Sequence, residues 1–134
     1  MKVLFICKGN YNRSQIAEAV YGELTHSNDA SSAGTYAGMP DEPEGQVLSD
    51  LMPSDWFETL ESHGLKLRDK RTKRLTPEML KEADVAVSMA EAPYIPEFLR
   101  ADPRVIWWDV ADNQSAEATY QQIKALMEGL TEIV

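Results

Sequence analysis

The sequence predicts an α/β fold, with a single three-layer domain over residues 1–134. Short continuous apolar runs, such as VLFIC at residues 3–7, are typical of strands that are buried on both faces of a parallel sheet. Segments with apolar residues at helical spacing alternate with these runs, as they do when helices cover both faces of such a sheet. We therefore expect a four-stranded parallel sheet of the flavodoxin or Rossmann type, built around one hydrophobic core.

The expected elements follow one another in a regular order. Strands are expected at residues 2–7, 29–35, 84–89 and 104–110. Helices are expected at residues 14–25, in two pieces within 43–63, at 76–83, around 93–99 and at 115–130. Loops are expected at residues 25–29 and 36–45.

Capping residues and prolines mark the expected helix boundaries. Pro53 divides the helical pattern within residues 43–63, because proline lacks the backbone donor that a helix interior needs. Thr76 is the expected N-cap of the following helix, and Pro77 occupies its first position. Ser115 is the expected N-cap of the closing helix.

Charge and cysteine content exclude several classes of function. The formal net charge is −9, and such a surface repels nucleic acids and anionic membranes, so neither is expected as a partner. The single cysteine, Cys7, rules out an internal disulfide and suits a reducing compartment. No apolar run approaches the roughly 18 residues of a membrane span, and the first run is too short for a signal peptide. We expect a cytoplasmic protein that is a monomer or a weak homodimer.

The segment CKGNYNRS, residues 7–14, joins the first expected strand to the first expected helix. Backbone amides at the start of a helix point toward an anion bound there. Gly9 and Asn10 tolerate the unusual backbone angles of a tight loop, and Arg13 carries a planar fork that binds two oxygens of a phosphate. Cys7 faces the same centre, where positive surroundings favour the thiolate. The segment therefore predicts a nucleophile beside a site for a tetrahedral oxyanion.

Two aspartates are expected at the same edge of the sheet, because the carboxyl ends of parallel strands meet there. Asp109 lies at the end of the fourth expected strand, and Asp112 lies just past it. Either carboxyl group can serve as a general acid beside the loop. Trp107 and Trp108 are adjacent on that strand, so we expect one in the core and the other toward the rim of the site.

The segment at residues 64–76 holds six of the thirteen basic residues of the chain. Its charges are clustered between residues 66 and 74. A run of this kind is either a solvated face or a surface that steers an anionic substrate toward the protein.

These motifs resemble the low-molecular-weight protein tyrosine phosphatase family, which shares its fold with thiol-dependent arsenate reductases. The resemblance starts from the pattern C-x-x-x-x-x-R-S at residues 7–14 and covers most of the chain. SSAGT at residues 31–35 is similar to the second-strand motif of the family, and residues 64–89 are similar to its middle segment. WWDVADNQS at residues 107–115 lies where the family carries its aspartate general-acid loop.

The resemblance implies a phosphomonoester hydrolase that forms a phosphocysteine intermediate and needs no metal or cofactor. Cys7 is then the nucleophile, and Asp112 is the general acid and later the general base. The expected substrate is a phosphorylated one, either a phosphotyrosine protein or a small aryl phosphate. Ser14 is expected to donate a hydrogen bond to the thiolate, and Asn10 to brace the loop. The implied phosphate-binding loop consists of Lys8, Gly9, Asn10, Tyr11, Asn12, Arg13 and Ser14.

Four departures from the family pattern bear on the site. Asn113 replaces the proline that usually follows the acid, and Asn12 stands where many members have a second cysteine. Lys70 stands near the position of a histidine that braces the loop asparagine in the family. Residues 35–63 are several residues longer than in the family, and the extra piece around residues 48–57 is expected at the mouth of the site.

Three alternatives follow from these departures. Asp109 is a second candidate for the general acid. An arsenate reductase is the second candidate activity, and it would have to rely on an external thiol because the chain has only one cysteine. The third candidate is a module that binds phosphorylated ligands and whose catalysis has weakened.

Overall fold

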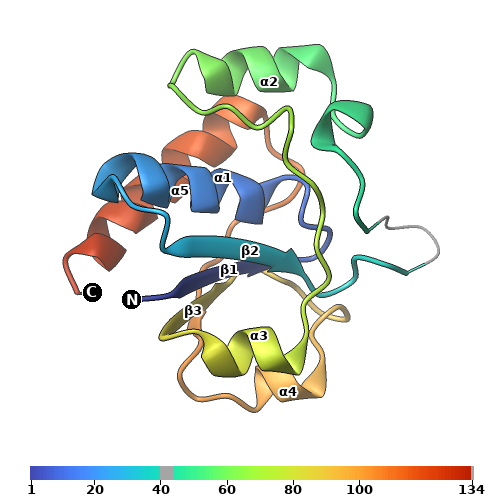
Figure 1. Cartoon of the computed structure of the whole chain (residues 1–134), viewed down its shortest axis with the longest axis vertical. Coiled ribbons are helices and arrows are strands. Elements are labelled where there is room, and N and C mark those ends of the chain that lie inside the picture. The colour runs from blue at the N-terminus through green and yellow to red at the C-terminus, as the bar shows by residue number, and fades with distance from the viewer. Residues whose placement is uncertain (40–43, 134) are drawn as a thin grey trace.

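The computed structural model of the protein consists of a four-stranded sheet between two layers of helices (Figure 1). It describes residues 1–39 and 44–133. The strand order is β2-β1-β3-β4, and all neighbouring strands are parallel. This order is that of flavodoxin-type sheets, so the expected fold class is confirmed.

The elements lie close to their expected positions. The strands are β1 (Val3–Cys7), β2 (Ala30–Gly34), β3 (Val85–Ser88) and β4 (Ile106–Trp107). The helices are α1 (Arg13–Thr25), α2 (Ser54–Glu61), α3 (Pro77–Glu82), α4 (Glu97–Arg100) and α5 (Ala116–Thr131), with a 3-10 turn η1 at Leu48–Asp50. The expected loop at residues 36–45 includes residues 40–43, which lie outside the described residues.

The two caps expected from the sequence are confirmed. The Thr76 hydroxyl accepts a hydrogen bond from the Met79 amide at 3.2 Å, and the Ser115 hydroxyl accepts one from the Ala118 amide at 3.1 Å. Each bond satisfies a backbone donor that the first turn of a helix leaves unpaired. None of the described helices has both the length and the apolar character needed to cross a membrane.

The fourth strand is shorter than the sequence predicts. Residues 104–110 are rich in β-branched and aromatic side chains, but only Ile106–Trp107 pairs with β3. β4 lies at the edge of the sheet, where it has a single partner, and that partner is itself only four residues long. Past this pairing the chain turns away from the sheet and enters the site described below.

Two hydrophobic cores flank the sheet. Helices α1, α2 and α5 cover one face, and α3 and α4 cover the other (Figure 1). On the first face Phe5 of β1 belongs to the same buried cluster as Ile16 of α1 and Ile123 of α5. On the second face Leu4 belongs to a cluster with Leu80 of α3. Successive side chains of a strand point to opposite faces, so the presence of two cores explains why every residue of β1 is apolar.

The carboxyl end of β2 lies against the loop that follows β1. Gly34 is the register partner of Cys7. A Cβ atom at Gly34 would lie 2.7 Å from the carbonyl oxygen of Lys8 and 2.9 Å from the amide nitrogen of Asn10. These neighbours are backbone atoms, so neither can rotate aside. Only glycine at this position allows the loop to approach the sheet so closely.

We predict that Gly34→Ala destabilises the protein by about 1–3 kcal/mol, because the added methyl group displaces the loop backbone. Gly129→Ala is the matched control, since Gly129 lies in α5 with no atom within 4 Å of an added Cβ. The control is expected to raise stability by up to about 1 kcal/mol. Urea unfolding curves measure both changes, and equal stability of the two variants would contradict the prediction.

Candidate active site

The loop between β1 and α1 surrounds the thiol of Cys7. The side chain is 2% exposed and lies at the carboxyl end of β1. Its Sγ lies 2.9 Å from the hydroxyl oxygen of Ser14, and it accepts a hydrogen bond from the Asn10 amide at 3.3 Å. One backbone donor and one hydroxyl group from the following residues of the loop therefore face the sulfur.

Asn10 holds the loop in shape through four side-chain hydrogen bonds. Its φ of 60° is in the left-handed region, and its side chain is completely buried. The amide nitrogen donates to the hydroxyls of Ser14 and Ser32 at 2.8 and 3.0 Å. The amide oxygen accepts from the side chain of Gln15 at 3.2 Å and from the backbone nitrogen of Lys73 at 2.8 Å. Every hydrogen-bonding position of the amide is thus used.

The bond between Asn10 and Ser14 sets the direction of the next bond. Because the Ser14 oxygen accepts from Asn10, its own proton is available to Cys7 Sγ. A hydroxyl that donates to sulfur stabilises the thiolate more than the thiol. The predicted roles of Asn10 and Ser14 therefore have a geometric basis in this chain.

Arg13 is the most deeply buried charged side chain near the thiol, with 1% of its surface exposed. Its Nη1 donates to the carbonyl oxygens of Met89 at 2.7 Å and Val110 at 2.9 Å. The carboxylate of Glu91 accepts from Nη1 at 2.7 Å and from Nη2 at 3.3 Å. One end of the guanidinium is therefore fixed by groups that follow β3 and β4.

The other edge of this guanidinium faces a different environment. Arg13 Nε lies 3.3 Å from Asp112 Oδ1, within ion-pair distance, yet it makes no hydrogen bond with any described residue. Burial lowers the pKa of Arg13, but the hydrogen bond to Glu91 and the nearby negative charges raise it above its usual value. The group therefore stays a cation, with a buried donor left for an oxyanion.

Asp112 lies next to the loop, as the sequence predicts. Its Oδ1 accepts a hydrogen bond of 3.4 Å from the Asn12 side chain. The oxygen of that Asn12 amide accepts in turn from the indole nitrogen of Trp56 at 3.3 Å. Trp56 belongs to the extra piece around residues 48–57, so this piece contacts the phosphate loop through Asn12. The position of the missing second cysteine is thus used to hold Asp112.

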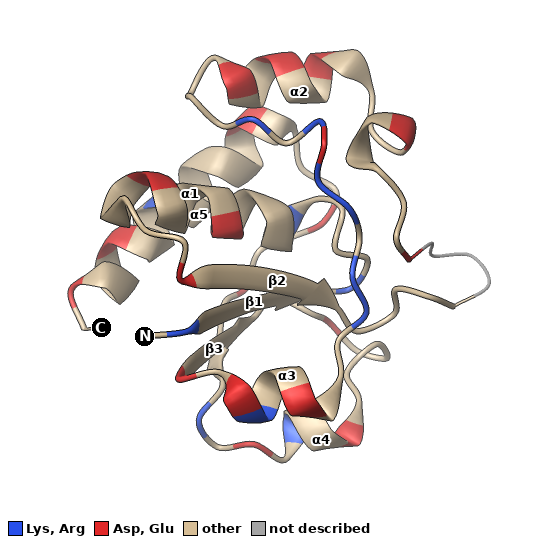
Figure 2. Cartoon of the chain, viewed as in Figure 1, with Lys and Arg blue, Asp and Glu red and all other residues tan. Residues whose placement is uncertain are grey.

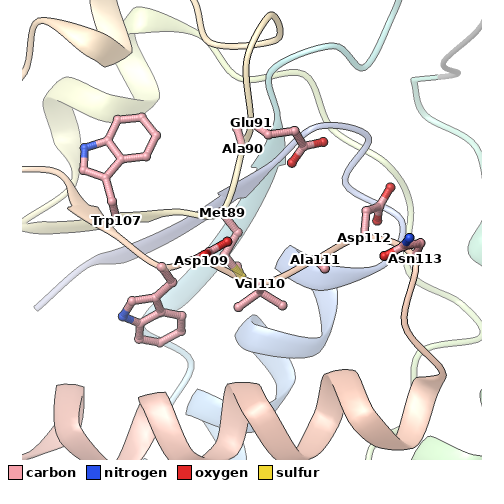
Figure 3. A pocket seen from close by; sticks show the side chains of 10 residues that line it. Met89, Ala90, Glu91, Trp107, Asp109, Val110, Ala111, Asp112 and Asn113 are labelled. Atoms are coloured by element: carbon pink, nitrogen blue, oxygen red, sulfur yellow. The ribbon is translucent and has the colours of Figure 1, made fainter.

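An open cleft of about 500 Å³ adjoins the site on the side of β4 (Figure 3). Asp112 lies at one end, Trp107 lies at the other, and Asp109 lies between them. Trp107 is 46% exposed, whereas Trp108 packs against Phe5 with ring centres 6.0 Å apart. This division of the two tryptophans matches the sequence prediction.

Two further residues of the loop, Lys8 and Tyr11, make contacts that involve aromatic rings. The ammonium of Lys8 lies 4.2 Å from the ring centre of Tyr94 and 5.5 Å from that of Tyr36. The ring of Tyr11 lies over Gly9, where a Cβ atom would be 2.2 Å from its Cε1. Aromatic rings and one cation therefore lie beside the loop.

Several residues of the site carry no signal in the sequence. Glu91 follows a strand by three positions and matches no motif, yet it holds Arg13. Ser32 and Gln15 brace Asn10, whereas Lys70 lies 3.7 Å from a carboxylate oxygen of Glu18. Side chains from α1 and β2 therefore brace Asn10, whereas Lys70 lies near Glu18.

We predict that Asn10→Gly lowers stability by about 2–4 kcal/mol, because it removes four hydrogen bonds and leaves buried partners unsatisfied. Asn10→Ala should cost about 1 kcal/mol more, because alanine is strained in the left-handed conformation. Urea unfolding of the two variants separates the side-chain contribution from the backbone contribution. Variants as stable as the wild type would show that the loop does not depend on Asn10.

Comparison with known proteins gives one family and several similar structures. A low molecular weight protein tyrosine phosphatase from T. tengcongensis has 26% identity and a TM-score of 0.75, with 100% of this chain and 99% of that chain covered. Vibrio vulnificus Wzb, solved with benzylphosphonate, has 21% identity and a TM-score of 0.79, with 99% and 98% covered.

A thioredoxin-dependent arsenate reductase from Corynebacterium glutamicum has 23% identity and a TM-score of 0.69, with 98% of this chain and 60% of that chain covered. At 21% and 23% identity, Wzb and the reductase support the fold alone. No curated protein sequence matches the chain. The profile of the family described as low molecular weight phosphotyrosine protein phosphatase matches residues 2–132. The chain therefore belongs to the low molecular weight phosphotyrosine protein phosphatase family.

Proposed function

We propose that the protein is a cysteine-dependent phosphomonoester hydrolase that works through a phosphocysteine intermediate. The observation that carries this proposal is the buried Arg13 guanidinium beside the Cys7 loop, whose Nε forms no hydrogen bond with a described residue although Asp112 lies 3.3 Å away. The guanidinium already has two carboxylates near it, Glu91 and Asp112, but the Nε donor is unused. A tetrahedral oxyanion would satisfy this donor together with the amides of residues 8–13. The same anion then lies in front of the Cys7 sulfur.

In the first step the Cys7 thiolate attacks phosphorus in line with the ester oxygen. The sulfur–phosphorus bond forms as the phosphorus–oxygen bond breaks, and Asp112 transfers its proton to the departing oxygen. Arg13 and the loop amides hold the equatorial oxygens, over which negative charge spreads in the transition state. Their positive charge is why the proposal includes no metal ion.

In the second step water hydrolyses the phosphocysteine. Asp112, now a carboxylate, removes a proton from the water molecule while the oxygen of that water attacks phosphorus. The sulfur–phosphorus bond breaks, and inorganic phosphate and the thiolate result. The Ser14 hydroxyl favours this departure because it donates to the sulfur at 2.9 Å.

The choice of Asp112 over Asp109 rests on distance to the loop. Asp112 contacts both Arg13 and Asn12, at 3.3 and 3.4 Å. Asp109 lines the middle of the cleft, and its backbone carbonyl accepts a hydrogen bond from Gln122. Asp112 is thus the carboxyl group that stands where a leaving oxygen would emerge from the loop.

We predict that the wild-type protein hydrolyses p-nitrophenyl phosphate in the presence of EDTA and that Cys7→Ser abolishes turnover. Asp112→Asn should lower kcat at least about tenfold, since general acids typically contribute that much or more. The loss should be larger for phenyl phosphate, because its leaving group is more basic and needs the proton more. Asp109→Asn is the matched control and should retain kcat within about twofold for both substrates.

Other results would point to the alternatives. A larger loss from Asp109→Asn than from Asp112→Asn would reassign the general acid. Arsenate reduction that requires an added thiol, without ester hydrolysis, would favour the reductase. Binding of orthovanadate without any turnover would favour a module that binds phosphorylated ligands.

A further inference from the structure

Basic residues are concentrated on the coil between α2 and α3, where much of the ribbon is blue in Figure 2. The segment from residue 64 to residue 76 holds six of the thirteen basic residues of the chain and only one acidic residue. The chain as a whole carries a net charge of −9, so this segment is a local exception to the acidic surface. We define the basic band as Lys66, Arg68, Lys70, Arg71, Lys73 and Arg74.

One end of the basic band is joined to the phosphate loop by backbone hydrogen bonds. The backbone nitrogen of Lys73 donates to the Asn10 side chain at 2.8 Å, and its carbonyl accepts from the Gly34 amide at 2.8 Å. Arg74 forms an isolated bridge with Gly34, which is the partner of Cys7 in the sheet. At a strand spacing of about 4.8 Å, the backbone of Arg74 lies about 10 Å from that of Cys7.

The basic residues nearest the loop form no close ion pair with a carboxylate of the described residues. Arg68 pairs with Glu61 at 2.6 Å, and Lys70 lies 3.7 Å from Glu18. The basic residues at the end nearest the loop are Arg71, Lys73 and Arg74. Their charged nitrogens have no carboxylate within 4.0 Å among residues 1–39 and 44–133. Arg71 instead donates to the carbonyl of Gly45, at 2.7 Å. Glu44 accepts a hydrogen bond from the Arg74 backbone nitrogen at 3.1 Å, and Glu18 attracts the Lys73 ammonium, so the positive charge at this end is only partly offset.

The opposite side of the site is acidic. Glu91, Asp109 and Asp112 line the cleft at the carboxyl ends of β3 and β4 (Figure 3). The basic band lies beyond β2, on the other side of β1 in the strand order. The site thus has a positive side and a negative side. A peptide bound across it would meet opposite charges on the two sides of its phosphorylated residue.

We propose that the basic band binds acidic residues on one side of the phosphorylated residue in a protein substrate. This inference rests on the proposed function. An extended peptide advances about 3.3 Å per residue, so an acidic side chain about three residues from a phosphotyrosine in the loop reaches Arg74. A small aryl phosphate fills only the loop and cannot extend to the basic band.

The net charge of the protein gives a physical reason for a local basic surface beside the site. A phosphorylated acidic peptide is repelled by a protein of charge −9, and clusters of opposite charge beside a site offset such repulsion and speed association. Peptides with acidic residues on the correct side gain this attraction. Peptides without them depend on the loop alone.

The test compares two phosphotyrosine peptides that differ only in carrying several glutamates or the same number of glutamines on one side. The variant Arg71→Gln/Arg74→Gln should reduce kcat/KM for the glutamate peptide about five- to tenfold. The values for the glutamine peptide and for p-nitrophenyl phosphate should change less than about twofold. Added salt should also remove the preference of the wild type for glutamate.

Lys81→Gln/Arg100→Gln is the matched control, because it makes the same change in net charge at exposed positions on α3 and α4. A similar loss in the control would assign the effect to overall charge and overturn the inference. An equal loss for all three substrates would show that the two arginines only support the loop, which also overturns it. Equal kcat/KM for both peptides in the wild type would overturn the inference and leave the proposed function standing.

Measurements of peptide binding test this inference independently of catalytic activity. If the wild type fails to hydrolyse p-nitrophenyl phosphate, the proposed function is overturned, but fluorescently labelled forms of the two peptides still report on the basic band. Tighter binding of the glutamate peptide to Cys7→Ser, lost when Arg71→Gln/Arg74→Gln is added, supports the inference. Equal binding of the two peptides overturns it.

Discussion

The burial of the Arg13 guanidinium is the constraint around which the site is organised. An unpaired charge in such a position would cost several kcal/mol, so the fold must supply acceptors around it. These acceptors come from two separate connections: Met89 and Glu91 follow β3, and Val110 follows β4, where Asp112 adds a negative charge at ion-pair distance. The need to satisfy one cation therefore fixes the ends of three strands relative to one another. Val110 and Asp112, which lie past the end of β4, take part in this arrangement.

A second constraint acts on the backbone of the loop. Asn10 has a left-handed backbone conformation, and every hydrogen-bonding position of its side chain is used. The coil at residues 71–75 contributes two of the hydrogen bonds in this region: the carbonyl of Arg71 accepts from the Gln15 side chain, and the amide of Lys73 donates to the Asn10 side chain. Gly34 allows this coil, the end of β2 and the loop to pack with backbone against backbone. The shape of the loop thus depends on main-chain contacts with residues that are distant in the sequence. The basic residues of the coil are carried to the edge of the site as a consequence of the same contacts.

Much of the fold and of the reactive loop could be predicted, because local patterns specify them. The apolar run of β1, the caps Thr76 and Ser115, and the spacing of Cys7 and Arg13 all act over a few residues. Glu91 could not be found in this way, because its role depends on where β3 ends relative to a loop nearly eighty residues earlier. The length of β4 was overestimated because strand propensity does not register how many partners an edge strand has. The bracing of Asn10 by Ser32 and Gln15 likewise exists only once β2 and α1 are packed together.

The close approach of Gly34 to the loop has a consequence for how this protein can change. Main-chain contacts and the inward side chains of Asn10 and Ser14 hold the loop around Cys7, whereas the ammonium of Lys8 lies over the ring of Tyr94. Substitutions at the mouth can then alter which compounds are admitted while the reacting groups keep their places. The range of accepted substrates can therefore change during evolution through residues outside the loop interior. The positions of Cys7, Asn10 and Ser14 need not change with it.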